Sequence, residues 1–445
     1  MSIFKACDIR GTYGKDLTAE DAFEIGRAFG TMVEGRSVAV GGDVRISTPI
    51  LKRELMRGLS ESGCCVLDIG VLPTPAFYYA KRRLDMYAGV MVTASHNPAC
   101  YNGFKITFGQ LPVQEEDMKH LEIIVKDKNY RSGKGSVESN PMLEEYRKYI
   151  KSLFKKTSEK FKVVIDAGNG VCGPVALELF SELGYETVPL FCEPDGNFPN
   201  REPNPAVAEN LKHLQKLVVE TKADMGIAFD GDGDRVAFID ENGNILTSER
   251  AIIIFAKYLF KKYGAGKVVY DHKCSTIVEK EILKAGGSVI REKSGHAFIK
   301  RTFLLQNAVM AGEISGHYFF RELAGDDGIY AALLMGELLN EEKAKLSQLS
   351  LEIPNYYITP DIRIPYPYDD KEELLNSIKE RFEDYPIDTL DGVRVVFPNG
   401  WGLIRISVTE PMITMRFEGC TPEALISIKE RFISAIPKIR ALIRD

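Results

Sequence analysis

The stretch Ala88-Gly89-Val90-Met91-Val92-Thr93-Ala94-Ser95-His96-Asn97-Pro98 joins a short apolar run to a polar turn. The apolar part contains β-branched residues and predicts a buried strand, and the small and polar residues before Pro98 predict a loop at its end. Ser95 is therefore expected to be a hydroxyl held on a rigid element. A free serine is a poor nucleophile without an activating partner, so its function depends on what else reaches it. Taken alone, Thr93 to Pro98 could equally be a simple polar turn.

The composition is that of an ordinary globular protein. The chain has 445 residues, of which 44% are hydrophobic, and 57 basic against 63 acidic side chains give a net charge of -6. This length allows three or four domains, and the charge balance argues against a nucleic-acid partner. We also expect no membrane partner, because no apolar run is long enough to cross a bilayer, and we predict no protein partner. The eight cysteines are scattered without C-x-x-C spacing, which predicts reduced thiols and a cytoplasmic protein.

Strands and helices alternate along most of the chain, and this pattern predicts an α/β fold. Three similar units each end a strand on an unusual polar loop, whereas the last part has antiparallel hairpins. We therefore predict three mixed-sheet α/β domains plus a C-terminal α+β domain around a central cleft. The predicted limits are 1–140, 141–244, 245–353 and 354–445. Within the third domain, the pattern predicts a helix from Asp326 to Leu339.

An acidic loop follows the predicted strand Met225 to Phe229 and reads Asp230-Gly231-Asp232-Gly233-Asp234-Arg235. Carboxylates this close repel one another unless a cation lies among them, and hard oxygen donors without histidine or cysteine favour magnesium. A calcium loop is an alternative, because Glu241 falls at its twelfth position, but Arg235 stands where that loop needs glycine. A solvated acidic turn is the other alternative.

Further polar loops carry candidate sugar and phosphate ligands. Glu313, Ser315 and His317 alternate along one loop, His296 lies on a glycine loop, and Arg405 lies near a strand end. An arginine can bind a phosphate with two hydrogen bonds. Taken singly, such loop residues are more often part of a surface turn, and a lone histidine is usually structural.

Together these motifs resemble the α-D-phosphohexomutase family over essentially the whole chain, and within it the phosphomannomutase/phosphoglucomutase group. The opening Phe4-Lys5-Ala6-Cys7-Asp8-Ile9-Arg10-Gly11, the loop around Ser95 and the acidic loop carry the resemblance. It implies that Ser95 is phosphorylated and that one Mg²⁺ is bound per chain. The implied metal ligands are Ser95, Asp230, Asp232 and Asp234. The implied catalytic residues are Ser95, Arg10, His96, Lys105 and His317. The implied substrate-binding residues are Arg235, Lys273, His296, Glu313, Ser315, Arg405, Ser407 and Thr409.

The resemblance implies a mutase that interconverts the 1- and 6-phosphates of mannose, glucose or both, with a phosphorylated hexose as its partner. Hexose 1,6-bisphosphate would be the intermediate and activator, and Lys105 and His317 are unranked candidates for the general base. Three positions differ from the common family pattern: Cys7, Val408 and Thr276 stand where Tyr, Asn and a basic residue are often found.

Three alternatives remain open. A phosphoglucosamine mutase is the nearest, although that group usually has Gln where Ile314 stands. Asp230 could itself be phosphorylated, as in haloacid-dehalogenase-type enzymes. The chain could also be a non-catalytic protein that binds sugar phosphates.

Overall fold

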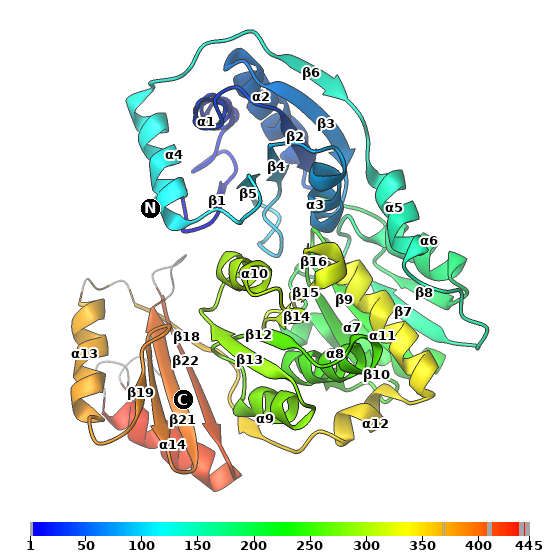
Figure 1. Cartoon of the computed structure of the whole chain (residues 1–445), viewed down its shortest axis with the longest axis vertical. Helices are drawn as coiled ribbons and strands as arrows, with labels where there is room; N and C mark the ends of the chain where they lie inside the picture. The colour runs from blue at the N-terminus through cyan, green and yellow to red at the C-terminus, as the bar shows by residue number, and fades with distance from the viewer. Residues whose placement is uncertain (1–2, 367, 369, 407–411, 436–439, 441–445) are drawn as a thin grey trace.

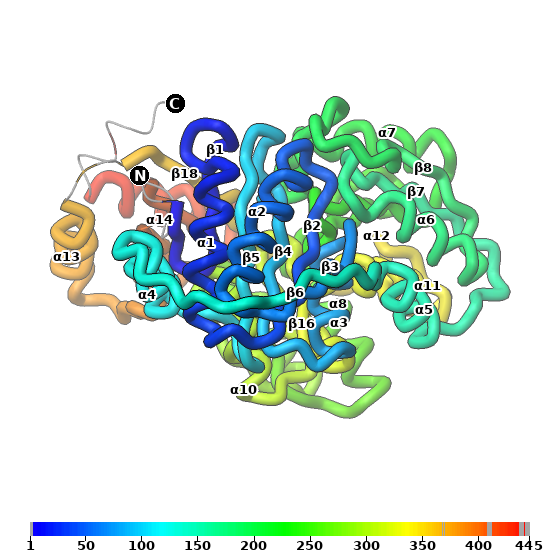
Figure 2. Tube along the Cα trace, turned by 90° about the horizontal axis from the view of Figure 1, so that it is seen from above, coloured from blue at the N-terminus to red at the C-terminus, as the bar shows by residue number. Residues whose placement is uncertain are grey.

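The chain folds into four units arranged around a central cleft, as seen in a computed structural model that describes residues 3–366, 368, 370–406, 412–435 and 440. Figure 1 shows the first unit above the second and third, which pack side by side, and the fourth at the lower left. Seen from above, the orange and red fourth unit and the green second unit lie at opposite ends, with the first between them (Figure 2).

Unit I contains a sheet whose described strands run in the order β1-β5-β4-β2-β3-β6. Its strands are β1 (Ile9–Thr12), β2 (Val38–Gly42), β3 (Cys65–Val71), β4 (Ala88–Val92), β5 (Tyr101–Phe108) and β6 (Ser136–Ser139). Its helices are α1 (Ala19–Met32), α2 (Thr48–Glu61), α3 (Thr74–Arg83) and α4 (Glu115–Asp127), and α5 (Leu143–Ser152) leads into the next unit. The residues that start α1 are well suited to do so, because Thr18 and Asp21 form a reciprocal capping box.

Units II and III each contain a smaller mixed sheet. The elements of unit II are β7 (Lys162–Asp166), α6 (Gly173–Glu182), β8 (Glu186–Leu190), the 3₁₀ turn η1 (Ala208–Leu211), α7 (Lys212–Thr221), β9 (Met225–Phe229), β10 (Val236–Asp240) and β11 (Ile245–Leu246). Those of unit III are α8 (Ser248–Tyr263), β12 (Lys267–Asp271), α9 (Thr276–Lys284), β13 (Ser288–Glu292), α10 (His296–Leu305), β14 (Met310–Gly312), β15 (Tyr318–Phe320), the 3₁₀ turn η2 (Arg321–Leu323), β16 (Gly325–Asp326), α11 (Gly328–Glu342) and α12 (Leu346–Leu351).

The three sheets repeat one scheme of strand pairing. Strands β2, β7 and β12 each lie between two parallel neighbours, and an antiparallel strand follows on one side. The polar loops predicted to carry chemistry leave the equivalent strands β4, β9 and β14. Each loop then turns back into its antiparallel partner, so all three lie at corresponding positions of their sheets. Strands β9 and β10 flank the acidic loop, which argues against the helix-flanked calcium loop.

One predicted element boundary is wrong. The helix expected from Asp326 begins at Gly328, because Asp327 caps it by accepting a hydrogen bond from the Tyr330 N–H. Asp326 instead belongs to the short strand β16. In this position the Asp326 side chain contacts His296 and His317.

Unit IV is an antiparallel sheet with two described helices. Its elements are β17 (Tyr357–Ile358), β18 (Ile362–Pro365), α13 (Lys371–Arg381), β19 (Ile387–Asp388), β20 (Val393–Phe397), β21 (Gly400–Ile406), β22 (Met412–Gly419) and α14 (Pro422–Ser434). The predicted fold class, three α/β domains and a C-terminal α+β domain, is confirmed.

The hydrophobic core is continuous through units II and III and reaches α3 of unit I, whereas unit IV has a separate core. Helix α11 is buried along most of its length and also contacts β10 of unit II. Units II and III are therefore joined by apolar packing, and unit IV is an independently packed body. Among the described residues, no helix combines the length and apolar character needed to cross a membrane.

Candidate active site

A cleft of about 1270 Å³ lies between the four units, and residues from all of them line it. The predicted site residues at its wall are Arg10, Ser95, His96, Lys105, Asp234, Arg235, Lys273, His296, Glu313, Ser315, His317 and Arg405. Asp230 and Asp232 are fully buried next to this wall. Ser407 and Thr409 lie outside the described residues, as does Val408. The structure thus brings together residues that are more than 300 positions apart in the chain.

Ser95 meets the acidic loop directly. Its hydroxyl donates a hydrogen bond of 2.7 Å to Asp230 Oδ2, and its Oγ lies 3.4 Å from His96 Nδ1. The backbone at Ser95 is left-handed, with φ of +48°, which is uncommon for a residue other than glycine. Such conformations persist only where the surroundings hold them. The loop therefore presents the hydroxyl to the acidic loop in a strained, constrained geometry.

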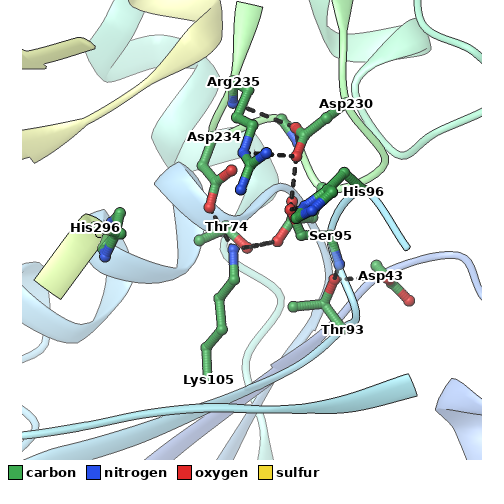
Figure 3. A network of polar contacts seen from close by, with 12 residues as sticks. Asp43, Thr74, Thr93, Ser95, His96, Lys105, Asp230, Asp234, Arg235 and His296 are labelled. Atoms are coloured by element: carbon green, nitrogen blue, oxygen red, sulfur yellow. Dashed lines mark hydrogen bonds and ion pairs between the residues drawn. The ribbon is translucent and has the colours of Figure 1, made fainter. Parts of the chain in front are cut away.

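The three aspartates form one compact group at the end of β9. Burial raises the pKa of Asp230 well above its usual value, and the charges of Asp232 and Asp234 add to this effect. Lys105 of β5 donates to Asp232 Oδ2 at 2.8 Å and to Asp234 Oδ2, as seen in Figure 3 for Asp234. Thr74 donates to Asp232 Oδ2 at 2.6 Å. The acidic loop of unit II is thus held by side chains of unit I.

These residues fit a divalent cation. One carboxylate oxygen from each of Asp230, Asp232 and Asp234 lies within 4.8 Å of the others. Asp232 Oδ1 and Asp234 Oδ1 are buried and have no hydrogen-bond partner among the described residues. Buried oxygens without donors are costly unless a cation binds them. A set of oxygen donors alone suits magnesium better than zinc.

Two histidines lie beside the acidic loop and share one carboxylate. His317 Nδ1 lies 2.9 Å from Asp326 Oδ2, and His296 Nε2 lies 2.9 Å from both Asp326 oxygens. His317 Nε2 accepts a 3.0 Å hydrogen bond from Arg235 Nε, so the proton of the neutral ring is on Nδ1. Burial lowers the pKa of His317, and this favours the neutral form. Asp326 was not predicted as a site residue, because the sequence pattern placed it in a helix.

Arg10 and Lys105 of unit I and Arg235 of unit II line the cleft together with Ser95. Arg10 lies 2.8 Å from Asp8 through Nε and donates through Nη1 to the Asn97 side chain. Arg235 points toward Asp230 across 4.0 Å (Figure 3). Burial lowers the pKa of His96, and the nearby charge of Arg235 lowers it further. His96 is therefore neutral, and the positive charge around Ser95 comes from the arginines and Lys105.

The far side of the cleft belongs to units III and IV. Burial raises the pKa of Glu313 to about 8, and its Oε2 accepts a hydrogen bond of 3.1 Å from Ser315. Lys273 Nζ lies 2.8 Å from Asp361 Oδ2. Arg405 Nε lies 2.8 Å from Asp391 Oδ2. This side offers carboxyl, hydroxyl and cationic groups without any of the three clustered aspartates.

The comparisons with known proteins agree with this arrangement. Four family models match in order: phosphoglucomutase/phosphomannomutase α/β/α domain I at residues 1–132, domain II at 144–243, domain III at 247–357 and the C-terminal domain at 362–435. The chain belongs to the phosphoglucomutase/phosphomannomutase family. The predictions of this family and of a phosphohexomutase enzyme are confirmed.

Individual family members are similar over nearly their whole length. A phosphomannomutase/phosphoglucomutase of Pseudomonas aeruginosa is 41% identical over 438 residues, covering 97% of this chain and 94% of that protein. A phosphoglucomutase of Neisseria gonorrhoeae is 38% identical, covering 98% and 96%. The crystal structure of a phosphoglucomutase/phosphomannomutase family protein from Burkholderia thailandensis superposes with a TM-score of 0.92 at 36% identity, covering 98% and 97%.

Sequence reasoning missed the residues that support the site from behind. Arg45, Thr74 and Asp326 contact predicted site residues, and Asp43 holds Arg45 and Thr93. Each of the four is at most 2% exposed. One signal was available in the sequence: Asp43 and Arg45 place two charged residues directly after the apolar strand β2. No spacing rule could have indicated which loop they contact.

Proposed function

We propose that the protein interconverts hexose 1-phosphates and hexose 6-phosphates of mannose, glucose or both by way of a phosphorylated Ser95 and a bound hexose 1,6-bisphosphate. The observation that carries this proposal is the 2.7 Å hydrogen bond from Ser95 Oγ to Asp230, at the wall of a cleft lined by all four units. A hydroxyl beside a divalent-cation site can accept and return a phosphoryl group.

At the transfer end, Asp230, Asp232 and Asp234 would hold one Mg²⁺ together with Ser95. When bound, this ion neutralises charge on the transferring phosphoryl group. Arg10 and Lys105 would contribute further positive charge there. His96, next to Ser95, would contact the phosphoryl oxygens. Buried cations act strongly in such a site because little water screens them.

The two candidate bases differ in their charge. Burial favours the neutral amine of Lys105, but the charges of Asp232 and Asp234 outweigh burial and raise the pKa of Lys105. A protonated lysine supplies positive charge and has no lone pair with which to accept a proton. His317 is neutral and is backed by Asp326, so we assign it the role of general base. His317 Nε2 becomes free to accept a proton when the Arg235 side chain moves away from it to bind a phosphate of the substrate.

At the recognition end, Arg405 with Ser407 and Thr409 would bind the phosphate that is not being transferred. Glu313 and Ser315 would bind ring hydroxyls, and Lys273, His296 and Arg235 would complete the pocket. The bisphosphate would then turn end for end in the cleft, so that Ser95 recovers its phosphate from the other position. A cavity of about 1270 Å³ has room for a bisphosphate to reorient.

The rival in which Asp230 is the nucleophile fits the contacts less well. Asp230 is fully buried, its Oδ1 accepts the N–H of Gly233 at 2.8 Å, and its Oδ2 accepts the Ser95 hydroxyl. Asp230 does not line the cleft. Ser95, which lines the cleft, is the better placed acceptor.

Two further proposals follow from the same site and chain. We propose the limits 1–140, 141–244, 245–353 and 354–445 for the four domains. All eight cysteines are free thiols, which supports a cytoplasmic location.

The decisive experiment is a coupled assay of the purified protein on mannose 1-phosphate, glucose 1-phosphate and glucosamine 1-phosphate, with Mg²⁺ and a trace of glucose 1,6-bisphosphate. We expect turnover of the mannose or glucose ester and an acid-stable phosphate on Ser95. Turnover of the glucosamine ester alone, or a hydroxylamine-labile acyl phosphate in place of phosphoserine, would contradict the proposal.

A further inference from the structure

A buried acid stands at the end of the equivalent strand in each of the three repeated sheets. Asp43 follows β2, Asp166 ends β7 and Asp271 ends β12, and each is at most 2% exposed. In units I and II this acid is paired with a buried arginine. The two pairs have the same form but contact different loops. Replacing one pair can therefore serve as a control for replacing the other.

Arg45 uses its guanidinium to bind the backbone of the Ser95 loop. The side chain is fully buried, and Nε lies 3.2 Å from Asp43 Oδ2. Nη2 donates to the carbonyls of Ser95 at 2.8 Å and Asn97 at 2.6 Å. Nη1 donates to the carbonyls of Pro98 at 2.7 Å and Tyr101 at 2.9 Å. The guanidinium thus contacts the loop at four carbonyls, and its planar fork fixes them relative to one another.

A second arm runs from the same acid to the backbone N–H of Ser95. Thr93 Oγ1 donates to Asp43 Oδ2 at 2.7 Å and accepts from the Ser95 N–H at 2.9 Å (Figure 3). Asp43 also accepts from Thr48 Oγ1 at 2.7 Å. Ser95 is therefore held at its N–H through Thr93 and at its carbonyl by Arg45. These are the two peptide groups that define its left-handed backbone.

We propose that Asp43 and Arg45 are positioning residues that hold the Ser95 hydroxyl in its reactive orientation. This rests on the proposed role of Ser95 as the phosphorylated residue. Neither Asp43 nor Arg45 lines the cleft, so neither touches substrate. Without the pair, four carbonyls lose the guanidinium that joins them, Thr93 loses the acceptor that orients its hydroxyl, and the left-handed backbone at Ser95 relaxes. A small displacement of a reacting hydroxyl lowers the rate while leaving distant substrate contacts intact.

The corresponding pair in unit II provides the control. Arg201 Nε lies 2.8 Å from Asp166 Oδ2, and its Nη2 donates to the Phe229 carbonyl at 2.8 Å. Phe229 directly precedes Asp230, so this pair supports the acidic loop. Arg201 is also buried, and its replacement removes a comparable ion pair from a comparable place.

The experiment compares Arg45→Lys and Thr93→Val with Arg201→Lys. Each variant is measured for thermal unfolding, for kcat and KM on the hexose 1-phosphate that the wild type turns over, and for Mn²⁺ affinity of the dephosphorylated enzyme. For Arg45→Lys we expect kcat to fall by about tenfold or more, with KM and Mn²⁺ affinity within about twofold of wild type. Thr93→Val should lower kcat by about fivefold in the same way. Arg201→Lys should weaken Mn²⁺ binding by about fivefold or more.

A folded Arg45→Lys or Thr93→Val enzyme with kcat within about twofold of wild type would overturn the proposal. So would a loss of kcat matched by an equal loss of Mn²⁺ affinity, because general loosening would then explain both. If Arg45→Lys does not fold, Thr93→Val decides, since it removes only one hydroxyl. A wild-type protein without phosphoserine would instead refute the proposed function, so the two failures are distinguishable.

Discussion

The contact between units I and II differs in kind from the contact between units III and IV. The first is made by residues of the site itself: Ser95 donates to Asp230, and Thr74 donates to the Asp232 backbone carbonyl at 2.8 Å. The second includes one site residue, since Lys273 Nζ lies 2.8 Å from Asp361 Oδ2 of unit IV. Further contacts lie behind the site: Arg416 Nη1 of unit IV donates to the Lys273 carbonyl at 2.7 Å, and Arg394 Nη1 donates to the His272 carbonyl at 2.9 Å.

The hydrophobic packing around the two contacts also differs. Residues of unit I next to the site, such as Ala76 and Phe77 of α3, belong to the hydrophobic core that runs through units II and III. Unit IV has its own core and meets unit III at the loop after β12 through polar groups. Under the proposed function, the half of the cleft that would transfer phosphate (units I and II) is therefore expected to be rigid, and the half that would recognise substrate (units III and IV) is expected to hinge. Substrate entry and rotation need motion, whereas transfer needs fixed geometry.

The most severe test of the rigid half is Ser95→Ala. It removes the proposed phosphate carrier, and we expect kcat to fall by about 10⁴-fold or more. Binding of the hexose 6-phosphate, measured by calorimetry, should stay within about threefold, because the recognition half is unchanged. Normal turnover by this variant would mean that another group carries the phosphate.

Asp232→Asn tests the cation site. The substitution removes one of three clustered carboxylate charges, at the side chain that accepts from Lys105 and Thr74. We expect Mg²⁺ affinity, measured by calorimetry, to fall by about 100-fold. The matched control is Glu220→Gln, which removes a carboxylate on the exposed face of α7. Equal Mg²⁺ affinity in the two variants would contradict a site at the acidic loop.

The hinged half is tested by Arg416→Gln combined with Glu249→Gln. Arg416 Nη2 lies 2.9 Å from Glu249, so the double variant removes the pair without leaving one buried charge unpaired. We expect KM to rise by about fivefold and kcat to change by less than about twofold. The radius of gyration from X-ray scattering should increase as unit IV opens. A fall in kcat at constant KM would instead place this contact in the transfer half.

The smallest effect concerns pH and Glu313. Burial raises its pKa from the ordinary 4.5 to about 8, so between these values the folded protein holds a proton that the unfolded chain has lost. The free energy of unfolding therefore contains a contribution that is lost as pH rises through this range, at most about 1.4 kcal/mol per pH unit. Glu313→Gln should flatten the decline seen in urea unfolding between pH 5 and 8. Parallel curves for the two proteins would argue against a protonated Glu313.

Much of the site could be predicted because its chemistry lies on short loops that follow apolar strands. Ser95, the three aspartates and Glu313 each follow a run that is recognisable without tertiary information. The supporting residues could not be found in this way. Asp326 looked like the start of a helix, and Arg45 meets its loop only because β2 and β4 are neighbours in the sheet. Hydrogen bonds between distant segments leave no periodic pattern in a sequence.

The sequence by itself determined the α/β class, the polar loops and the types of ligand they offer, because strand periodicity and side-chain chemistry are local properties. Only the tertiary structure decided that Ser95 meets Asp230, that Lys105 is held charged and that His317 is neutral. Those properties depend on burial and on which charges face one another. Both are set by how four separately patterned units pack around one cleft.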